Sequence, residues 1–270
     1  MIVNFLKKNY RLNNGIYTKK FNSFGQNKEF KLRRNVGLKS YNNYFTEISK
    51  YHSIGVMDHE IIKFTDRLKK NSIVLDLGCG WCWHWRNIHK IRPDIKIVGI
   101  DFVKENFDHA KKILSKKSLR QFYFINDNIN NIKFNKNLFD AIWTVQAFQH
   151  IPNLNKLLKI VYKVLKPEGI IYNYNLNDSL FIKIKNFIFR NRNTKNYYYL
   201  NRNLDFNKKL FTKIFKKKVF IEFNEILFHP EFNFFLGKRN SFFSKLDAKL
   251  SGFSLIKSYL ARQVLLKVMK

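Results

Sequence analysis

The chain has 270 residues, 45% of them hydrophobic, so it is long enough to bury a full core as one large domain and is not a disordered tail. Its two cysteines cannot staple a secreted scaffold, and its formal charge of +32 favours anionic partners, although a solvated basic surface is the simpler interpretation. Without a signal peptide or a run of ~20 apolar residues, the sequence predicts a cytoplasmic protein that does not cross a membrane.

The positive charge is concentrated in two segments. Residues 1–40 carry ten Lys and Arg against Glu29 alone, and residues 179–219 carry twelve against Asp205 alone. A coding bias toward lysine would more readily spread the excess over the whole chain. We therefore expect two basic appendages on a more balanced core.

Short apolar runs alternate with segments of helical spacing along the chain. The expected strands are 72–78, 96–101, 121–126, 139–145 and 169–176, and two of the helical segments are 104–114 and 155–165. Residues 219–270 contain two further strand patterns. The alternation predicts an α/β fold: a doubly wound, Rossmann-like, mostly parallel sheet with helices on both faces and ligands at the carboxyl ends of the strands.

The segment "VLDLGCGWCWHWRNIHK" (residues 74–90) contains both cysteines. A zinc site drawn from Cys79, Cys82, His84 and His89 would have its first histidine one residue after the cysteine pair, which is too short to fold the ligands around one ion. A redox pair is partly supported by the strand-to-helix context. The Asp-x-Gly-x-Gly pattern explains more residues, because glycines let a ligand approach the backbone at a sharp turn. We predict a glycine loop and no metal site.

The ligand of this loop follows from the wider pattern. A dinucleotide fingerprint needs a third glycine at position 83, which is Trp83, so NAD is disfavoured. "VLDLGCG", an acid at the end of the second strand (Asp101), "FDAIWTVQAFQHIPN" and "VLKPEGIIYNYN" occur in an order that resembles the class I S-adenosylmethionine-dependent methyltransferases. The resemblance runs from about residue 51 to residue 177. It implies a seven-stranded sheet.

The resemblance also implies a domain organisation. Residues 1–50 form a basic N-terminal extension or lid, and residues 51–270 form the methyltransferase domain. Within that domain, residues 51–177 form the cofactor-binding core, residues 178–218 an insertion after the fifth strand, and residues 219–270 the final strands.

Carried over by residue, the resemblance assigns a binding site for S-adenosylmethionine. The loop would surround the methionine portion, and Asp101 would accept hydrogen bonds from the ribose hydroxyls, unless it only caps the following helix. An acid near the adenine amine would be Asp127 or Asn128. Trp81, Trp83 and Trp85 either wall the pocket or serve in packing. The expected cofactor-binding residues are Asp76, Gly78, Cys79, Gly80, Asp101, Phe102, Asp127, Asn128 and Gln146.

The implied reaction is methyl transfer, for which His150 is the candidate base, with packing or capping as its alternative role. The acceptor is expected to be a small molecule, a glycan or a lipid-linked compound, methylated at oxygen. RNA methylation and a non-catalytic, cofactor-binding role remain as alternatives. Four basic residues of the insertion are expected to form a positive rim for an anionic acceptor, or to give peripheral membrane contact: Lys183, Lys185, Arg190 and Arg192.

Overall fold

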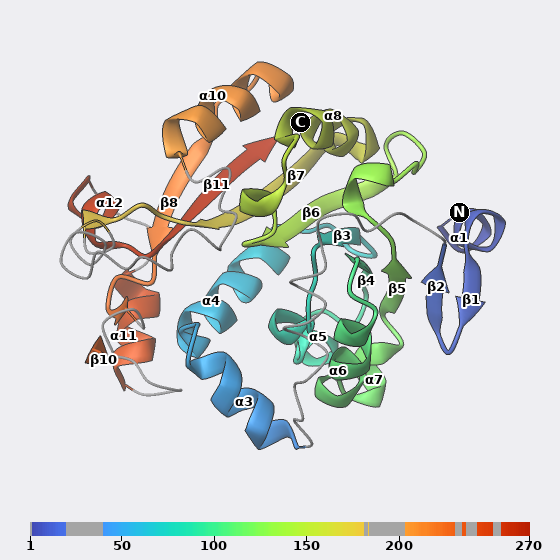
Figure 1. Cartoon of the computed structure of the whole chain (residues 1–270), viewed down its shortest axis with the longest axis horizontal. Coiled ribbons are helices and arrows are strands. Elements are labelled where there is room, and N and C mark those ends of the chain that lie inside the picture. Colours follow the sequence, from blue (N-terminus) through green and yellow to red (C-terminus); the bar gives the residue numbers. More distant parts are fainter. Residues whose placement is uncertain are drawn as a thin grey trace.

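The computed structural model shows an α/β fold around one mixed sheet (Figure 1). It describes residues 2–19, 40–180, 183, 203–229, 234–235, 242–250 and 255–270. Most of the predicted insertion, including Lys185, Arg190 and Arg192, lies outside the described residues.

The sheet has nine strands in the order β1-β2-β5-β4-β3-β6-β7-β11-β8. Its parallel centre consists of β3 (Ile73–Leu77), β4 (Lys96–Asp101), β5 (Phe122–Asn126), β6 (Phe139–Val145) and β7 (Leu165–Leu176). β11 (Gln263–Met269) runs antiparallel between β7 and β8 (Phe220–Asn224). The alternation of strands and helices is thus confirmed, but the predicted number of seven strands is wrong.

The two additional strands come from the N-terminal segment, which was expected to precede the first strand. β1 (Arg11–Asn13) and β2 (Ile16–Thr18) form a hairpin, with Asn14 and Gly15 at positive φ in its turn. β2 then pairs in parallel with β5 and lengthens the sheet at that edge. Part of the expected extension therefore belongs to the sheet itself.

Helices cover both faces of the sheet. On one face α1 (Ile2–Asn9), α8 (Leu154–Val164) and α10 (Leu204–Phe215) share an apolar cluster with the strands, including Leu6, Leu157 and Phe211. The other face is packed by α4 (Ile54–Thr65), α5 (Ile88–Ile91), α6 (Glu105–Ile113) and α7 (Lys116–Leu119), through residues such as Phe64 and Phe107.

Smaller elements complete the described chain. They are α3 (Tyr41–Ser49), α11 (Phe242–Leu250), α12 (Leu255–Leu260), the pair β9 (Phe228–His229) and β10 (Phe234–Phe235), and three short 3₁₀ helices: η1 (Trp83–Trp85), η2 (Ile129–Asn131) and η3 (Phe148–His150). Within the described ranges, no helix is both long and apolar enough to span a bilayer.

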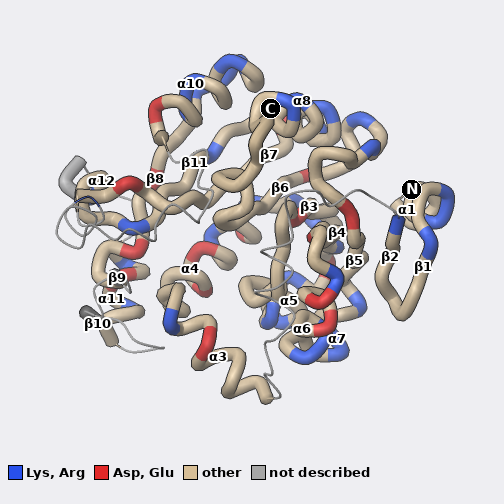
Figure 2. The backbone as a smooth tube through the Cα atoms, viewed as in Figure 1, with Lys and Arg blue, Asp and Glu red and all other residues tan. Residues whose placement is uncertain are grey.

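Basic positions recur along α8 and α10 (Figure 2). The exposed residues are Lys156, Lys159 and Lys163 on α8, and Lys208, Lys209 and Lys213 on α10. The two helices contact each other. The basic surface of the second charged segment therefore continues onto a helix of the core, which the sequence count did not single out.

Candidate functional site

The loop after β3 turns sharply and lies close to β6. Gly78 and Gly80 have φ of +71° and +51°, where side chains are disfavoured. A Cβ on Gly78 would lie 2.5 Å from the Cβ of Ala147, just beyond β6, whereas one on Gly80 would meet no described atom within 4 Å. The loop is thus tightly packed at its first glycine and open at its second.

Asp76 is a buried carboxyl on β3, directly before this loop. Its Oδ2 accepts a hydrogen bond of 2.7 Å from Trp85 Nε1. Burial raises the pKa of Asp76 to about 7, the nearby negative Asp101 adds to the rise, and the Trp85 hydrogen bond opposes it. The site therefore contains a carboxyl that titrates near neutral pH.

Asp101 ends β4 and joins two neighbouring loops. Its Oδ2 accepts a hydrogen bond of 2.9 Å from the backbone N–H of Gly80, and its Oδ1 accepts one of 2.8 Å from that of Val103. The residue that directly precedes α6 is Lys104, which makes no side-chain cap hydrogen bond, so Asp101 does not occupy the N-cap position that was its alternative role. Phe102, the next residue, accepts a hydrogen bond of 3.0 Å from Asn126 Nδ2 at its carbonyl, which connects the ends of β4 and β5.

Asp127 and Asn128, between which the sequence did not decide, have different surroundings after β5. Asp127 is fully buried; its Oδ1 accepts from the N–H of Asn128 at 2.8 Å, and its Oδ2 accepts from the Tyr10 hydroxyl at 2.9 Å. The Oδ1 of Asn128 accepts from the N–H of Asn130 at 3.0 Å and so caps η2. The amide of Asn128 is used by its own turn, while the Asp127 carboxylate faces the N-terminal segment. The contact with Tyr10 could not be predicted from the sequence pattern.

Gln146 follows β6 with a φ of +54°. Its N–H donates to the carbonyl of Tyr174 at 2.7 Å, which fixes the backbone between β6 and β7. Its side-chain Nε2 is buried and has no hydrogen-bond partner among the described residues. Because a buried amide without an acceptor is unfavourable, this group is a candidate for contact with a bound molecule.

His150 lies at the end of η3 and is exposed. Its Nε2 is 3.2 Å from the Nε2 of the buried Gln149. The Oε1 of Gln149 accepts from the N–H of Leu176 at 3.0 Å, so Gln149 connects η3 to the end of β7. Since a Gln amide nitrogen only donates, this contact needs an unprotonated imidazole nitrogen.

The tryptophans of the loop serve mainly in packing. Trp81 meets Tyr44 of α3 edge to face, with ring centroids 5.4 Å apart, and Trp83 stacks on Tyr41 at 5.4 Å. Trp85 enters the core and contacts Phe64. Trp81 and Trp83 thus pack α3 against the glycine loop.

Cys79 and Cys82 are free and buried, and burial raises the pKa of both thiols. Such thiols are poor nucleophiles and poor metal ligands at neutral pH. In the part of the chain that the structure describes, no group of three or more His, Cys, Asp or Glu is arranged to hold a metal ion.

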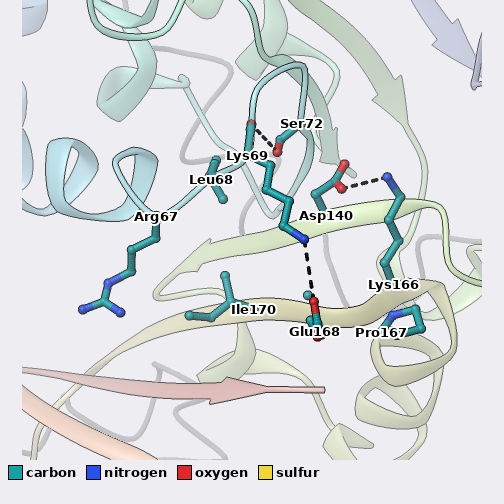
Figure 3. A pocket seen from close by; sticks show the side chains of 10 residues that line it. Arg67, Leu68, Lys69, Ser72, Asp140, Lys166, Pro167, Glu168 and Ile170 are labelled. Atoms are coloured by element: carbon teal, nitrogen blue, oxygen red, sulfur yellow. Dashed lines mark hydrogen bonds and ion pairs between the residues drawn. The ribbon is translucent and has the colours of Figure 1, made fainter.

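A hollow lies at the opposite end of the strands, near the starts of β3, β6 and β7 (Figure 3). Its lysines are paired: Lys69 lies 3.6 Å from Glu168, and Lys166 lies 2.7 Å from Asp140. The residues predicted to bind the cofactor are all at or beyond the carboxyl ends of strands, and none lines this hollow. Of the predicted rim, Lys183 is exposed and lies 3.8 Å from Asp178.

A family model described as a methyltransferase domain matches residues 68–218, more than half of the chain. The chain belongs to this methyltransferase family. This family agrees with the resemblance to the class I enzymes, and it implies S-adenosylmethionine as the cofactor.

Curated relatives of the methyltransferase match only in part. It is 30% identical to the sterol 24-C-methyltransferase of Aspergillus fumigatus over 115 residues, 42% of this chain and 30% of the relative. It is 29% identical to the demethylmenaquinone methyltransferase of Lactococcus lactis over 97 residues, 36% of this chain and 38% of the relative. The methyltransferase spans only about a third of the length of these relatives, and their names point to small-molecule acceptors.

Solved structures support the fold. A Bacillus halodurans protein described as a methyltransferase aligns with a TM-score of 0.53 at 15% identity, over 79% of this chain and 98% of that one. The cyclase SpnF aligns with a TM-score of 0.54 at 14% identity, over 78% of this chain and 79% of that one. At such low identities the likeness concerns architecture alone, and the architecture carries more than one chemistry.

Proposed function

We propose that the chain transfers a methyl group from S-adenosylmethionine to a small-molecule acceptor, with the cofactor at the carboxyl edge of β3, β4, β5 and β6. The observation that carries this proposal is the hydrogen bond from the Gly80 N–H to Asp101 Oδ2, because it joins an open glycine turn to a carboxylate at the next strand end. A ligand that bridges β3 and β4 would meet both groups.

The residues present suit this cofactor chemically. Asp76, Gly78, Cys79 and Gly80 would surround its methionine portion, and the raised pKa of Asp76 suits a carboxyl that ionises beside a cationic group. Asp101 and Phe102 would hold the ribose. Asp127, rather than Asn128, would receive the adenine amine, because the Asn128 oxygen is used in capping η2. The unpartnered Nε2 of Gln146 supports a further polar contact. The residues that we assign to the cofactor are thus Asp76, Gly78, Cys79, Gly80, Asp101, Phe102, Asp127 and Gln146.

The bound cofactor would supply a methyl group activated by an adjacent sulfonium. The residues of the chain have the remaining tasks, namely to orient the acceptor, exclude water and remove a proton. We assign proton removal to His150. The ring is exposed, so an acceptor can approach it and the proton can pass to solvent. Because the lone pair of His150 Nε2 accepts from Gln149, this contact has to open before Nε2 takes a proton.

We place oxygen first as the methylated atom. A hydroxyl acceptor has to lose its proton, and an imidazole at the active-site edge is suited to that step. Carbon is the second candidate, because the sterol relatives are named for methylation at carbon 24. The exposed lysines of α10 suit an anionic acceptor, such as a glycan or a lipid-linked compound. They equally suit contact with a membrane surface.

The proposal is tested by following a radiolabelled methyl group. The protein is incubated with labelled cofactor and fractionated cell extract, and label is measured in the small-molecule, lipid, glycan and RNA pools. Entry into a small molecule supports the proposal, and the product's structure identifies the methylated atom. Label found mainly in RNA would replace the proposal with RNA methylation, and cofactor binding without any transfer would favour the non-catalytic alternative.

The role of His150 gives a sharper prediction. We expect His150→Ala to lower kcat about 100-fold near neutral pH, which is the lower range for loss of a general base. The dissociation constant of the cofactor should stay within a factor of two of the original, because His150 is assigned to the acceptor. Asp101→Ala is the matched comparison and should weaken cofactor binding. Unchanged kcat in His150→Ala would remove this residue from the mechanism.

A further inference from the structure

A buried hydrogen bond connects the N-terminal segment to the end of β5. The Tyr10 hydroxyl donates to Asp127 Oδ2 at 2.9 Å, although the two residues are 117 positions apart in the sequence. Both side chains are buried, Asp127 completely. Tyr10 follows α1 directly, and Ile2 and Leu6 of that helix pack in the same apolar cluster as Ile129. The packing of α1 therefore helps to fix the position of Tyr10, in addition to its hydrogen bond to Asp127.

The register of β2 and β5 explains why the two segments meet at this level. Thr18 pairs with Asn126, so the residues that follow them, Lys19 and Asp127, come out of the sheet side by side. The Lys19 Nζ lies 3.8 Å from Asp127 Oδ2 and 5.9 Å from the centre of the Tyr10 ring. Tyr10 and Lys19, which flank the N-terminal hairpin, thus bring one neutral donor and one positive charge to the same carboxylate oxygen.

The protonation of the Tyr10 hydroxyl fixes the direction of its hydrogen bond to Asp127. Burial, followed by the negative charge of Asp127 and the hydrogen bond to it, raises the pKa of the Tyr10 hydroxyl well above its usual range. Tyr10 therefore keeps its proton and donates. The carboxylate accepts one hydrogen bond at each oxygen, from the Asn128 N–H and from the Tyr10 hydroxyl, and Lys19 adds an ion pair at 3.8 Å. Since a carboxylate has about four acceptor positions, it has the capacity for a further donor.

We propose that Tyr10 is a positioning residue that holds Asp127 so that its free acceptor position selects a purine carrying a 6-amino group. The inference rests on the proposed cofactor site and goes beyond it, because it makes a hairpin outside the matched methyltransferase domain part of base recognition. A 6-oxo purine would present an oxygen to the carboxylate and be rejected. With the hydroxyl removed, the carboxylate is less well oriented, and this selectivity should fall.

The test compares two ligands and two tyrosines. Dissociation constants of S-adenosylhomocysteine and S-inosylhomocysteine are measured by calorimetry for the wild type, Tyr10→Phe and Tyr17→Phe. Tyr17 is a buried tyrosine in β2 of the hairpin that follows Tyr10, and the structure shows no hydrogen bond from it to Asp127. We expect Tyr10→Phe to weaken the adenosyl ligand about tenfold, in the range of hydrogen bonds to charged groups, and the inosyl ligand less than twofold. Tyr17→Phe should leave the ratio of the two constants unchanged.

The outcomes separate the two proposals. If the wild type does not bind S-adenosylhomocysteine, the proposed cofactor site is wrong and the inference falls with it. If the wild type binds but Tyr10→Phe keeps the ratio, or loses both ligands equally, only the inference is wrong. Should Tyr10→Phe not fold, hydrogen exchange of the wild type decides: the adenosyl ligand is expected to protect residues 10–18 more than the inosyl ligand does at equal saturation. Equal protection would overturn the inference.

Discussion

At the scale of single residues, the buried carboxyl of Asp76 links the site to stability. The folded protein holds this proton up to about pH 7, whereas an unfolded chain releases it near pH 4. Between these values the folded state binds more protons, so the free energy of unfolding should fall as pH rises. The full effect is at most about 4 kcal/mol, since one pKa unit corresponds to about 1.4 kcal/mol. Urea unfolding of the cofactor-free protein between pH 4 and 8 measures it.

Asp76→Asn supplies the control for that measurement. The amide is neutral at every pH, and its oxygen can still accept the hydrogen bond from Trp85 Nε1. We expect the stability of the variant relative to the wild type to grow between pH 4 and 7 and then to level off. Parallel stability curves for the two proteins would show that Asp76 does not titrate in this range.

At the scale of elements, α3 depends on the tryptophans of the glycine loop. Trp83 stacks on Tyr41, meets Phe45 edge to face at 6.0 Å, and carries the Arg86 guanidinium 4.6 Å from its ring centre. We expect Trp83→Ala to lower the stability of α3 by about 3 kcal/mol, a usual cost for removing a large buried aromatic residue. Faster hydrogen exchange at residues 41–49 should follow.

A surface aromatic residue close to α3 serves as the comparison for that variant. Tyr51 is 55% exposed, so Tyr51→Ala should leave the exchange of residues 41–49 nearly unchanged. If both variants accelerated exchange equally, the effect would come from general destabilisation, and the aromatic stack would not be what holds α3.

The elements that the sequence predicted best are the buried central strands. Residues 139–145 match β6 fully, because a strand covered on both faces is mostly apolar, here with Asp140 and Thr144 as the exceptions. β7 begins four residues earlier than the predicted start at Gly169. Lys166, Pro167 and Glu168 look like a turn, but they continue the strand next to an irregularity in the pairing of β6, with Glu168 at positive φ.

The N-terminal hairpin was missed for a different reason. Strands of three residues are too short to show a period, and the surrounding lysines suggested an exposed extension. Asn14-Gly15 between two such strands was the available signal, because both residues favour the positive φ of a two-residue hairpin turn. The carboxylates at the strand ends could be found from position alone. The contact of Tyr10 with Asp127 could not, because it depends on which strand the hairpin joins.

At the scale of the whole molecule, the C-terminal part closes onto the start of α4. The N–H of Gly55 donates to Ser244 Oγ at 2.7 Å, and a Cβ on Gly55 would lie 2.6 Å from the Ser244 carbonyl oxygen. Alanine normally favours a helix by up to about 1 kcal/mol over glycine. Here we expect Gly55→Ala to destabilise the protein by about 1–3 kcal/mol instead, because backbone has to move. Chemical unfolding gives the sign directly.

Ser244→Ala separates the clash from the hydrogen bond. It removes the acceptor for the Gly55 N–H without adding atoms and should cost about 1 kcal/mol. A stabilised Gly55→Ala would mean that α11 does not pack against α4 at this distance.

The attachment of the N-terminal hairpin to β5 has a consequence for the order in which the molecule is made. Residues 10 and 127 are 117 positions apart, and a ribosome adding about 5–20 residues per second needs roughly 6–25 s between them. During that interval β2 has no β5 to pair with, and a two-stranded hairpin alone is marginally stable at best in water. The first strands to be synthesised therefore enter the sheet only after β5, and the carboxylate at position 127 acquires its tyrosine partner only when both segments have left the ribosome.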